Sequence, residues 1–203
     1  MKGQPDHYFR KAKAEGFDAR SVYKLSAVDA RQRLLKRGDR VLDLGASPGS
    51  WAQYTLERIG EEGMLVAVDI NPAKKSMPAN ARFVLADCLS AEAAAALRPH
   101  APFDVLLSDM APKTTGVKAT DEARSLDLAE HALRLCDEML KPGGSFVAKV
   151  FEGGDFEGYL RQVRAAFSRV KLVRPEATRG RSFEIYVVGQ GFRAAPAPDA
   201  REG

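Results

Sequence analysis

The 203-residue sequence predicts an α/β fold, in which helices cover both faces of one mostly parallel sheet. Two observations predict it. Segments typical of strands alternate with segments typical of helices along most of the chain, and several strand segments are continuous apolar runs, as residues 64–69 are (MLVAVD). Such runs suit strands that are covered on both faces. Near the end of the chain, two strand segments follow each other without a helix between them, so we expect the last strand to be antiparallel.

Each element follows from local signals in the sequence. Ser21 suits the N-cap of the first predicted helix, and Gly38 follows its end. Apolar residues at helical spacing predict helices over residues 22–36, 50–59, 92–97, 121–140 and 156–167. Apolar runs predict strands over residues 40–44, 64–69, 82–87, 103–109, 145–150, 170–173 and 184–188. We therefore expect a seven-stranded sheet.

The chain is most simply one domain, long enough for a substantial core. Residues 1–20 are polar and basic, and we expect them to contact RNA and to be ordered in part only with a partner. Residues 21–193 carry the alternating elements and form the predicted domain. Residues 194–203, rich in Ala and Pro, read as a disordered tail.

The charge of the chain is distributed unevenly. The net charge is +4, but residues 1–40 hold 11 Lys and Arg against 5 Asp and Glu, and residues 161–182 hold 7 against Glu176 alone. If the two segments converge, they form a basic face for a polyanion such as a nucleic acid. The alternative is a set of solvated helix faces.

Composition argues against several other classes of protein. There is no run of 18 apolar residues, so we expect no membrane span, and the first residues lack the apolar core of a signal peptide. Cys88 and Cys136 lie in apolar contexts, as reduced buried thiols of a cytoplasmic protein do. The three histidines lack metal-ligand spacing, so we expect no metal.

The most informative stretch is residues 41–51 (VLDLGASPGSW), which reads as a strand, a glycine turn and a helix start. Gly45 and Gly49 let a ligand approach the backbone closely, and Pro48 and Ser50 suit the first helical positions. The fingerprint G-x-G-x-x-G and the P-loop ending are absent, which makes a nicotinamide dehydrogenase the weakest reading. The pattern D-x-G-x-x-P-G resembles instead the cofactor loop of S-adenosylmethionine-dependent methyltransferases. Their fold is the variant of the doubly wound α/β fold in which the last strand is antiparallel, as predicted here.

Three acidic residues end predicted strands. Ligands of open parallel sheets bind outside the carboxyl ends of the strands, where Asp69, Asp87 and Asp109 are expected. Asp69 follows Gly45 by 24 residues, close to the offset of an acid that bonds ribose hydroxyls. Asp87 could accept from an adenine amino group, and Trp51 either packs beside the adenosine or belongs to the core. The alternative is that these acids only form turns.

Lys149 lies within an otherwise apolar strand segment, SFVAKVF. A buried ammonium needs carboxylate partners, and Asp109 and Glu184 are the candidates. We expect Lys149 to face the crevice beside Asp109; a structural ion pair is the alternative.

A family resemblance adds to this reading. It is carried by residues 20–25 (RSVYKL), 43–51 (DLGASPGSW), 108–112 (SDMAP), 143–151 (GGSFVAKVF) and 181–186 (RSFEIY). Together these segments resemble the FtsJ/RlmE family of ribosomal RNA 2′-O-methyltransferases, over about residues 6–191. The family loop commonly reads Pro-Gly-Gly-Trp, and here Ser50 replaces the second glycine.

The resemblance implies a catalytic set and a cofactor site. The catalytic set falls on Lys24, Asp109, Lys149 and Glu184. Cofactor roles fall on Gly45, Gly49, Trp51, Asp69, Asp87 and Asp109. In the implied reaction S-adenosyl-L-methionine methylates the 2′-hydroxyl of a uridine in 23S rRNA, assisting late maturation of the large subunit. The expected partner is large-subunit rRNA in a 50S-type particle, and the expected protein is a cytoplasmic monomer without a membrane partner. Lys149 takes or steers the hydroxyl proton, or holds the 2′-oxygen.

Other functions stay open at this point. A relative of the same family would modify tRNA anticodon loops. A non-catalytic RNA-binding assembly factor could keep the fold, although the four catalytic residues speak against this. Methylation of a base or protein nitrogen is disfavoured, because Ser-Asp-Met-Ala-Pro stands where the Asn/Asp-Pro-Pro-Tyr motif of amino-group methylation would be.

Overall fold

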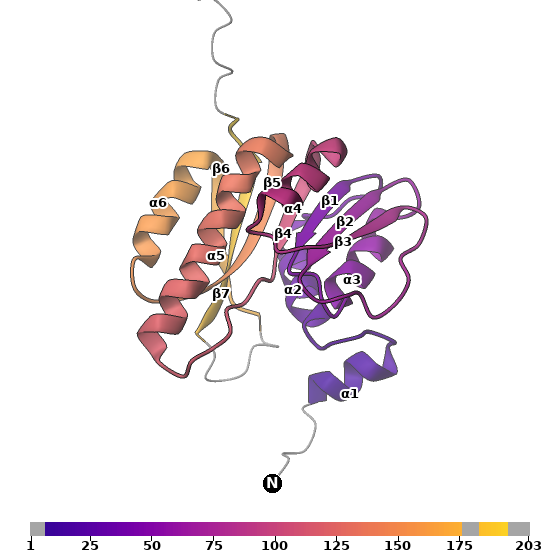
Figure 1. The fold of residues 1–203 in the computed structure, drawn as a ribbon, viewed down its shortest axis with the longest axis horizontal. Coiled ribbons are helices and arrows are strands. Elements are labelled where there is room, and N and C mark those ends of the chain that lie inside the picture. Colours follow the sequence, from indigo (N-terminus) through magenta and orange to yellow (C-terminus); the bar gives the residue numbers. More distant parts are fainter. Residues whose placement is uncertain (1–6, 176–182, 195–203) are drawn as a thin grey trace, which may run out of the picture.

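The fold is one sheet of seven strands between two layers of helices (Figure 1). It is seen in a computed structural model that describes residues 7–175 and 183–194. The strand order is β3-β2-β1-β4-β5-β7-β6. The strands are β1 (Arg40–Leu44), β2 (Met64–Asp69), β3 (Ala81–Leu85), β4 (Phe103–Ser108), β5 (Leu140–Phe151), β6 (Phe167–Val173) and β7 (Glu184–Phe192).

The direction of the strands agrees with the sequence. Strands β1 to β5 pair in parallel with one another, whereas β7 is antiparallel to both β5 and β6. The prediction of a seven-stranded, mostly parallel sheet with an antiparallel last strand is therefore confirmed. Since β1, β4 and β5 are parallel, their carboxyl ends meet at one edge of the sheet.

Two helical layers bury the sheet. The helices are α1 (His7–Ala14), α2 (Val22–Gln32), α3 (Ser50–Ile59), α4 (Ala91–Leu97), η1 (Arg98–His100), α5 (Lys118–Met139) and α6 (Phe156–Ala166). Leu25 of α2 and Ala52 of α3 share one apolar cluster with alternate residues of the central strands. Leu97, Leu133 and Leu160 bring α4, α5 and α6 into a second cluster on the opposite face. None of the helices in the described ranges is long and apolar enough to cross a membrane.

An additional helix, α1, precedes the predicted elements. It lies apart from the sheet at the lower end of the molecule in Figure 1. The ring of Tyr8 lies 5.5 Å from that of Tyr23, and the Tyr23 hydroxyl donates to Glu15 Oε2 at 2.6 Å. The connector between α1 and α2 is tied to α3, because Gln53 accepts from the Asp18 N–H at 2.9 Å and donates to the Gly16 carbonyl at 3.2 Å.

Several element ends differ from the prediction. Helix α2 stops at Gln32 instead of residue 36, because Arg33 takes the left-handed conformation (φ 53°). The carboxylate of Asp29 accepts from the N–H groups of Leu34 and Leu35 at 2.9 and 3.0 Å, so it replaces the hydrogen bonds of a further helical turn.

The strands also differ at their ends. Strand β5 begins at Leu140 instead of residue 145, because Leu140 pairs with Phe103. Strand β3 stops at Leu85, so Asp87 lies two residues beyond its end. The division into segment 1–20, domain 21–193 and tail 194–203 stays a prediction, and residues 195–203 of that tail lie outside the described residues.

Candidate active site

Three carboxylates surround a cavity of about 280 Å³ at the carboxyl edge of the sheet. Asp69 is the last residue of β2, Asp109 directly follows β4, and Asp87 follows β3. The backbone brings these acids to one cavity because β1 to β4 are parallel and in register. The sequence-based expectation that they lie at one edge therefore agrees with the fold.

The walls of this cavity combine apolar and acidic side chains. Ile70 and Leu89 are 60% and 50% exposed, and both line the cavity together with Met110. Exposed apolar side chains that gather at one place often mark a ligand-binding groove. An apolar slot with a few convergent polar groups is the usual chemistry of a small-molecule site. A nucleoside has flat apolar faces and a rim of hydroxyl and amino donors, so the apolar walls and carboxylate acceptors of this cavity fit one.

The acids at the rim are held in place by backbone donors. Asp69 accepts from the Ser47 N–H at 2.9 Å and from the Asn71 N–H at 2.7 Å. Asp87 accepts from the Leu89 N–H at 3.0 Å. A carboxylate oxygen can accept more than one hydrogen bond, so both groups keep capacity for a ligand's donors.

The glycine turn after β1 forms the floor of the site. Gly45 has φ +77°, and a Cβ there would lie 2.9 Å from the backbone nitrogen of Met110. Gly49, with φ +116°, is the N-cap of α3. Both positions require glycine, because the backbone is left-handed and the two loops pass close together. The free N–H groups of the α3 N-terminus favour a carboxylate near this turn.

Lys149 is buried, at 5% exposure, and points to the Asp109 side of this edge. Its Nζ donates to Asp109 Oδ1 at 2.9 Å and to the Asp109 carbonyl oxygen at 2.6 Å. The Tyr186 hydroxyl donates to the same Oδ1 at 2.9 Å. The ammonium therefore has the carboxylate partner that its burial requires.

A second ion pair joins α2 to β7. Lys24 Nζ lies 2.5 Å from Glu184 Oε2, and Lys24 is buried. Lys149 of β5 lies directly opposite Tyr186 of β7, so their side chains are on the same face of the sheet. Glu184 lies two residues before Tyr186 and shares that face, which α2 covers. The fold thus places both pairs on one face at one edge of the sheet.

Trp51 is buried in the core beside Tyr186. Its ring centroid is 5.7 Å from that of Tyr186, and its indole N–H donates to the Ser21 carbonyl oxygen at 2.9 Å. Together with Asp109 it lines a small cavity beside the larger one. Contact with a cofactor stays a prediction for Trp51, as do the site roles of the other sequence-predicted residues.

Asp43 is a buried acid below the glycine turn. Both of its carboxylate oxygens are buried and find no hydrogen-bond partner among the residues that the structure describes. Burial raises its pKa well above the ordinary value, and the nearby carboxylates of Asp109 and Asp69 raise it further. Asp43 therefore keeps its proton over a wider pH range than an exposed aspartate does.

Sequence reasoning missed some of the residues at this site. Tyr186 lies two residues after Glu184, so strand alternation places both on one face, but the hydrogen bond to Asp109 depends on the β5–β7 register. Ile70 directly follows Asp69, and Leu89 lies two residues after Asp87. This closeness to the predicted acids is the signal by which sequence reasoning could have found them. Within the described ranges, no group of three or more His, Cys, Asp or Glu side chains is arranged to hold a metal ion.

The sheet order, the glycine turn and the acids at the strand ends define a Rossmann-like methyltransferase. The model of the FtsJ-like methyltransferases matches residues 17–192. This chain belongs to the FtsJ-like methyltransferase family, as its sequence motifs predicted.

Full-length relatives support this membership. A protein of Oleidesulfovibrio alaskensis named ribosomal RNA large subunit methyltransferase E is 48% identical over 205 residues, which cover 100% of this chain and 99% of the relative. A protein of Myxococcus xanthus with the same name is 50% identical over 197 residues, 96% of this chain and 92% of the relative.

Solved structures show the same fold. A Plasmodium falciparum protein assigned to the ribosomal RNA methyltransferases has a TM-score of 0.79 at 23% identity, covering 88% of this chain and all of that chain. Human methyltransferase-like protein 13 in complex with SAH has a TM-score of 0.61 at 18% identity, covering 83% of this chain and 82% of that chain.

Proposed function

We propose that this protein uses S-adenosyl-L-methionine to methylate the 2′-hydroxyl of a uridine in large-subunit 23S rRNA. The names of its full-length relatives support large-subunit rRNA as the substrate. The proposal includes a 50S-type particle late in maturation as the partner, the cytoplasm as the location and a monomer as the active form.

The observation that carries the proposal is the buried Lys149 ammonium, 2.9 Å from Asp109 Oδ1 at the rim of the cavity. When bound, the cofactor supplies an electrophilic sulfonium methyl group. The protein then has to align a hydroxyl oxygen with that methyl and receive its proton. Lys149 takes the proton of the 2′-hydroxyl as a neutral amine, or as an ammonium it donates a hydrogen bond to the 2′-oxygen while the proton passes to water. Asp109 with Tyr186 fixes the position of the Lys149 Nζ. Orientation of this kind contributes about 7–11 kcal/mol, and proton transfer adds about 10²–10⁴-fold.

The second pair completes the catalytic set. Lys24 and Glu184 lie on the same face as Lys149, with Lys24 contributed by α2. In the proposal they hold the target ribose against the transferred methyl. A positive charge on Lys24 favours an oxygen that gains negative charge as its proton leaves.

The cofactor roles follow the chemistry of the cavity. We assign Asp69 to the ribose hydroxyls of the cofactor and Asp87 to its adenine amino group. Ile70, Leu89 and Met110 flank the adenine ring. The turn at Gly45 and Gly49 and the start of α3, where Trp51 lies, receive the methionine carboxylate.

Recognition of RNA rests on charge and on the ribose itself. The 2′-hydroxyl is the group that distinguishes RNA from DNA. Phosphate contacts by the basic residues of 1–40 and 161–182 make binding weaker as salt rises. Arg179 and Arg181 of the second segment lie outside the described residues.

The experiment compares 2′-O-methyl groups in large-subunit rRNA from cells with and without this protein, mapped by mass spectrometry. We expect one modified uridine to be lost, and to return when purified protein and S-adenosylmethionine are added to particles from the deficient cells. Particles reconstituted with 2′-deoxyuridine at that site should accept no methyl group. Methylation that persists on the deoxy substrate would show that a base is the target. A modification lost only from tRNA would favour the anticodon-loop alternative.

A further inference from the structure

A second cavity, of about 110 Å³, adjoins the candidate active site. Its walls come from the connector before α2, the first turns of α3 and the loop between β2 and β3. Leu56 and Met77 give it an apolar interior, and both pack against the core beneath α3. Pro48 lines this cavity as well as the small cavity that contains Asp109. The second cavity therefore lies across the glycine turn from the small cavity that Asp109 lines.

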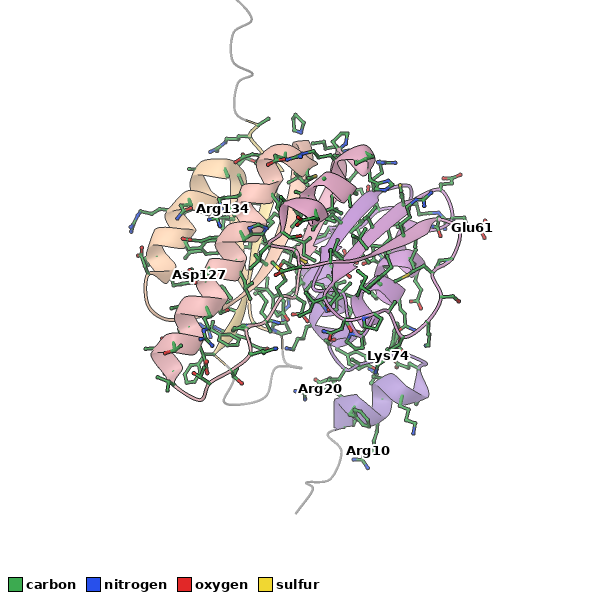
Figure 2. All side chains as sticks on the ribbon, viewed as in Figure 1. Arg10, Arg20, Glu61, Lys74, Asp127 and Arg134 are labelled. Carbon is green, nitrogen blue, oxygen red and sulfur yellow. The ribbon has the colours of Figure 1, made fainter. Side chains whose placement is uncertain are left out.

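The rim of this cavity is basic. Lys74 and Lys75, both exposed, lie at its edge. Lys75 Nζ lies 3.1 Å from Asp18 Oδ1, so an ion pair joins the loop to the connector. Figure 2 shows Arg10, Arg20 and Lys74 at the same lower end of the molecule. An apolar interior below a positive rim complements a ligand that has an apolar body and negative charges outside it.

The cavity is built before any ligand arrives. Both polar atoms of the Gln53 side chain hold the connector, through Asp18 and Gly16. At Gly49, a Cβ would lie 3.4 Å from Asp18 Oδ2, so the missing side chain leaves the connector close to the turn. A preformed wall lowers the conformational entropy that binding has to overcome.

We propose that this cavity binds the base of a nucleotide next to the methylated one, while Lys74 and Lys75 contact the phosphates of the same RNA strand. The inference rests on the proposed function, since the strand has to place its target ribose at Lys149. Pro48, Leu56 and Met77 contact the flat face of the base. The Asp18 carboxylate and the Ser76 hydroxyl also line the cavity, where they can form hydrogen bonds with the polar edge of the base. A splayed-out base is how proteins commonly read single-stranded RNA.

The first test fills the cavity. Ala73 lines it, whereas Ala79 is an exposed residue of the same loop outside it. We expect Ala73→Leu to raise the KM for large-subunit particles by about tenfold, the order expected when one base loses its contact surface. The kcat and the dissociation constant of S-adenosylmethionine should stay unchanged, and Ala79→Leu should behave as the wild type. Equal KM values for the two variants would overturn the inference.

The second test identifies the occupant. A photoreactive p-benzoylphenylalanine at position 76, an exposed position at the edge of the cavity, should cross-link to rRNA at a nucleotide beside the methylated uridine. A cross-link only to a ribosomal protein would assign the cavity to a protein partner and overturn the inference. A plot of log(1/KM) against log salt has a negative slope, and Lys74→Ala should make it shallower by about 0.7, the value for one phosphate of a single strand. Arg134→Ala is the control, because Arg134 is exposed on α5, lies outside both basic segments and stands away from Lys74 in Figure 2.

The two proposals fail in different ways. If wild-type protein methylates no large-subunit rRNA, the proposed function fails and the inference falls with it. If the wild type methylates the particles but Ala73→Leu and Ala79→Leu have equal KM values, only the base pocket is wrong.

Discussion

Lys24 and Glu184, 160 residues apart in the sequence, form an ion pair in which Nζ lies 2.5 Å from Oε2. This pair connects α2, which covers one face of the sheet, to the antiparallel strand β7. Both side chains are largely shielded from water, so the pair is screened less than a surface pair would be. It therefore fixes α2 relative to the β5–β7 edge, where Lys149 lies.

The first prediction concerns this pair. Lys24→Met and Glu184→Gln should each lower kcat/KM on large-subunit particles, and the double variant should lose little more than the worse single variant. The reason is that residues acting as one unit have strongly non-additive effects. Single-turnover methylation of particles by the four proteins of the cycle measures the coupling. Losses that simply add would show that the two side chains act independently.

Lys149→Met tests whether the buried lysine acts in the reaction. Methionine keeps most of the side-chain volume, so packing is largely preserved while the ammonium is lost. We expect kcat to fall by about 10²–10⁴-fold. Calorimetry should give a nearly unchanged affinity for S-adenosylmethionine. A loss of cofactor affinity of the same size would instead assign Lys149 a structural role.

A pair of tyrosines provides an internal comparison. Tyr186 and Tyr159 are both fully buried, but only the Tyr186 hydroxyl has a hydrogen-bond partner among the described residues, Asp109 Oδ1. Burial raises the pKa of both phenols well above the ordinary value, so each keeps its proton. Tyr186→Phe should lower the free energy of unfolding by about 1.5–3 kcal/mol, the range for a hydrogen bond to a charged group.

Tyr159→Phe should be neutral or stabilising by up to about 1–3 kcal/mol, because it removes a buried hydroxyl that lacks a partner. Chemical denaturation of both variants measures the difference. Only Tyr186→Phe should also reduce kcat, since its hydroxyl helps to orient the Asp109 carboxylate. Equal effects of the two substitutions on stability and on rate would contradict this account.

The sequence predicted the parts of the site that obey local rules. Lys149 stood out because a lysine interrupts an apolar strand, and Asp109 was found because it ends a strand at the ligand-binding edge. Lys24 was found only through the family resemblance, because an exposed-looking lysine on a helix carries no signal of its tertiary partner. Tyr186 was missed because its role depends on strand register, which depends on pairing of distant segments.

The second cavity could not be predicted from the sequence for a related reason. It needs the connector at Asp18 to lie against α3, and the connector was expected to be ordered in part only with a partner. Gln53 holds the connector, but no sequence pattern predicts the hydrogen bonds of its side chain to Asp18 and Gly16. The early end of α2 at Gln32 has the same origin, because the carboxylate of Asp29 stabilises the turn through contacts that helical periodicity does not describe.

The last prediction concerns Asp43 and pH. Because burial raises its pKa in the folded protein above the unfolded value of about 3.9, the folded state binds this proton more tightly. The stability contribution of Asp43 is thus complete below about pH 3.9 and is lost as the pH rises through the folded pKa. Asp43→Asn removes the titration but keeps the shape. We expect its melting temperature to match that of the wild type near pH 4 and to exceed it increasingly from pH 5 to pH 8.

Thermal unfolding across this pH range checks the expectation, with about 2–4 °C for each kcal/mol in a protein of this size. Asp127→Asn is the control, because Asp127 is exposed on α5 and points away from the sheet (Figure 2). Its melting temperature should keep a constant offset from that of the wild type. A constant offset for Asp43→Asn as well would mean that Asp43 binds its proton no more tightly in the folded protein than in the unfolded chain.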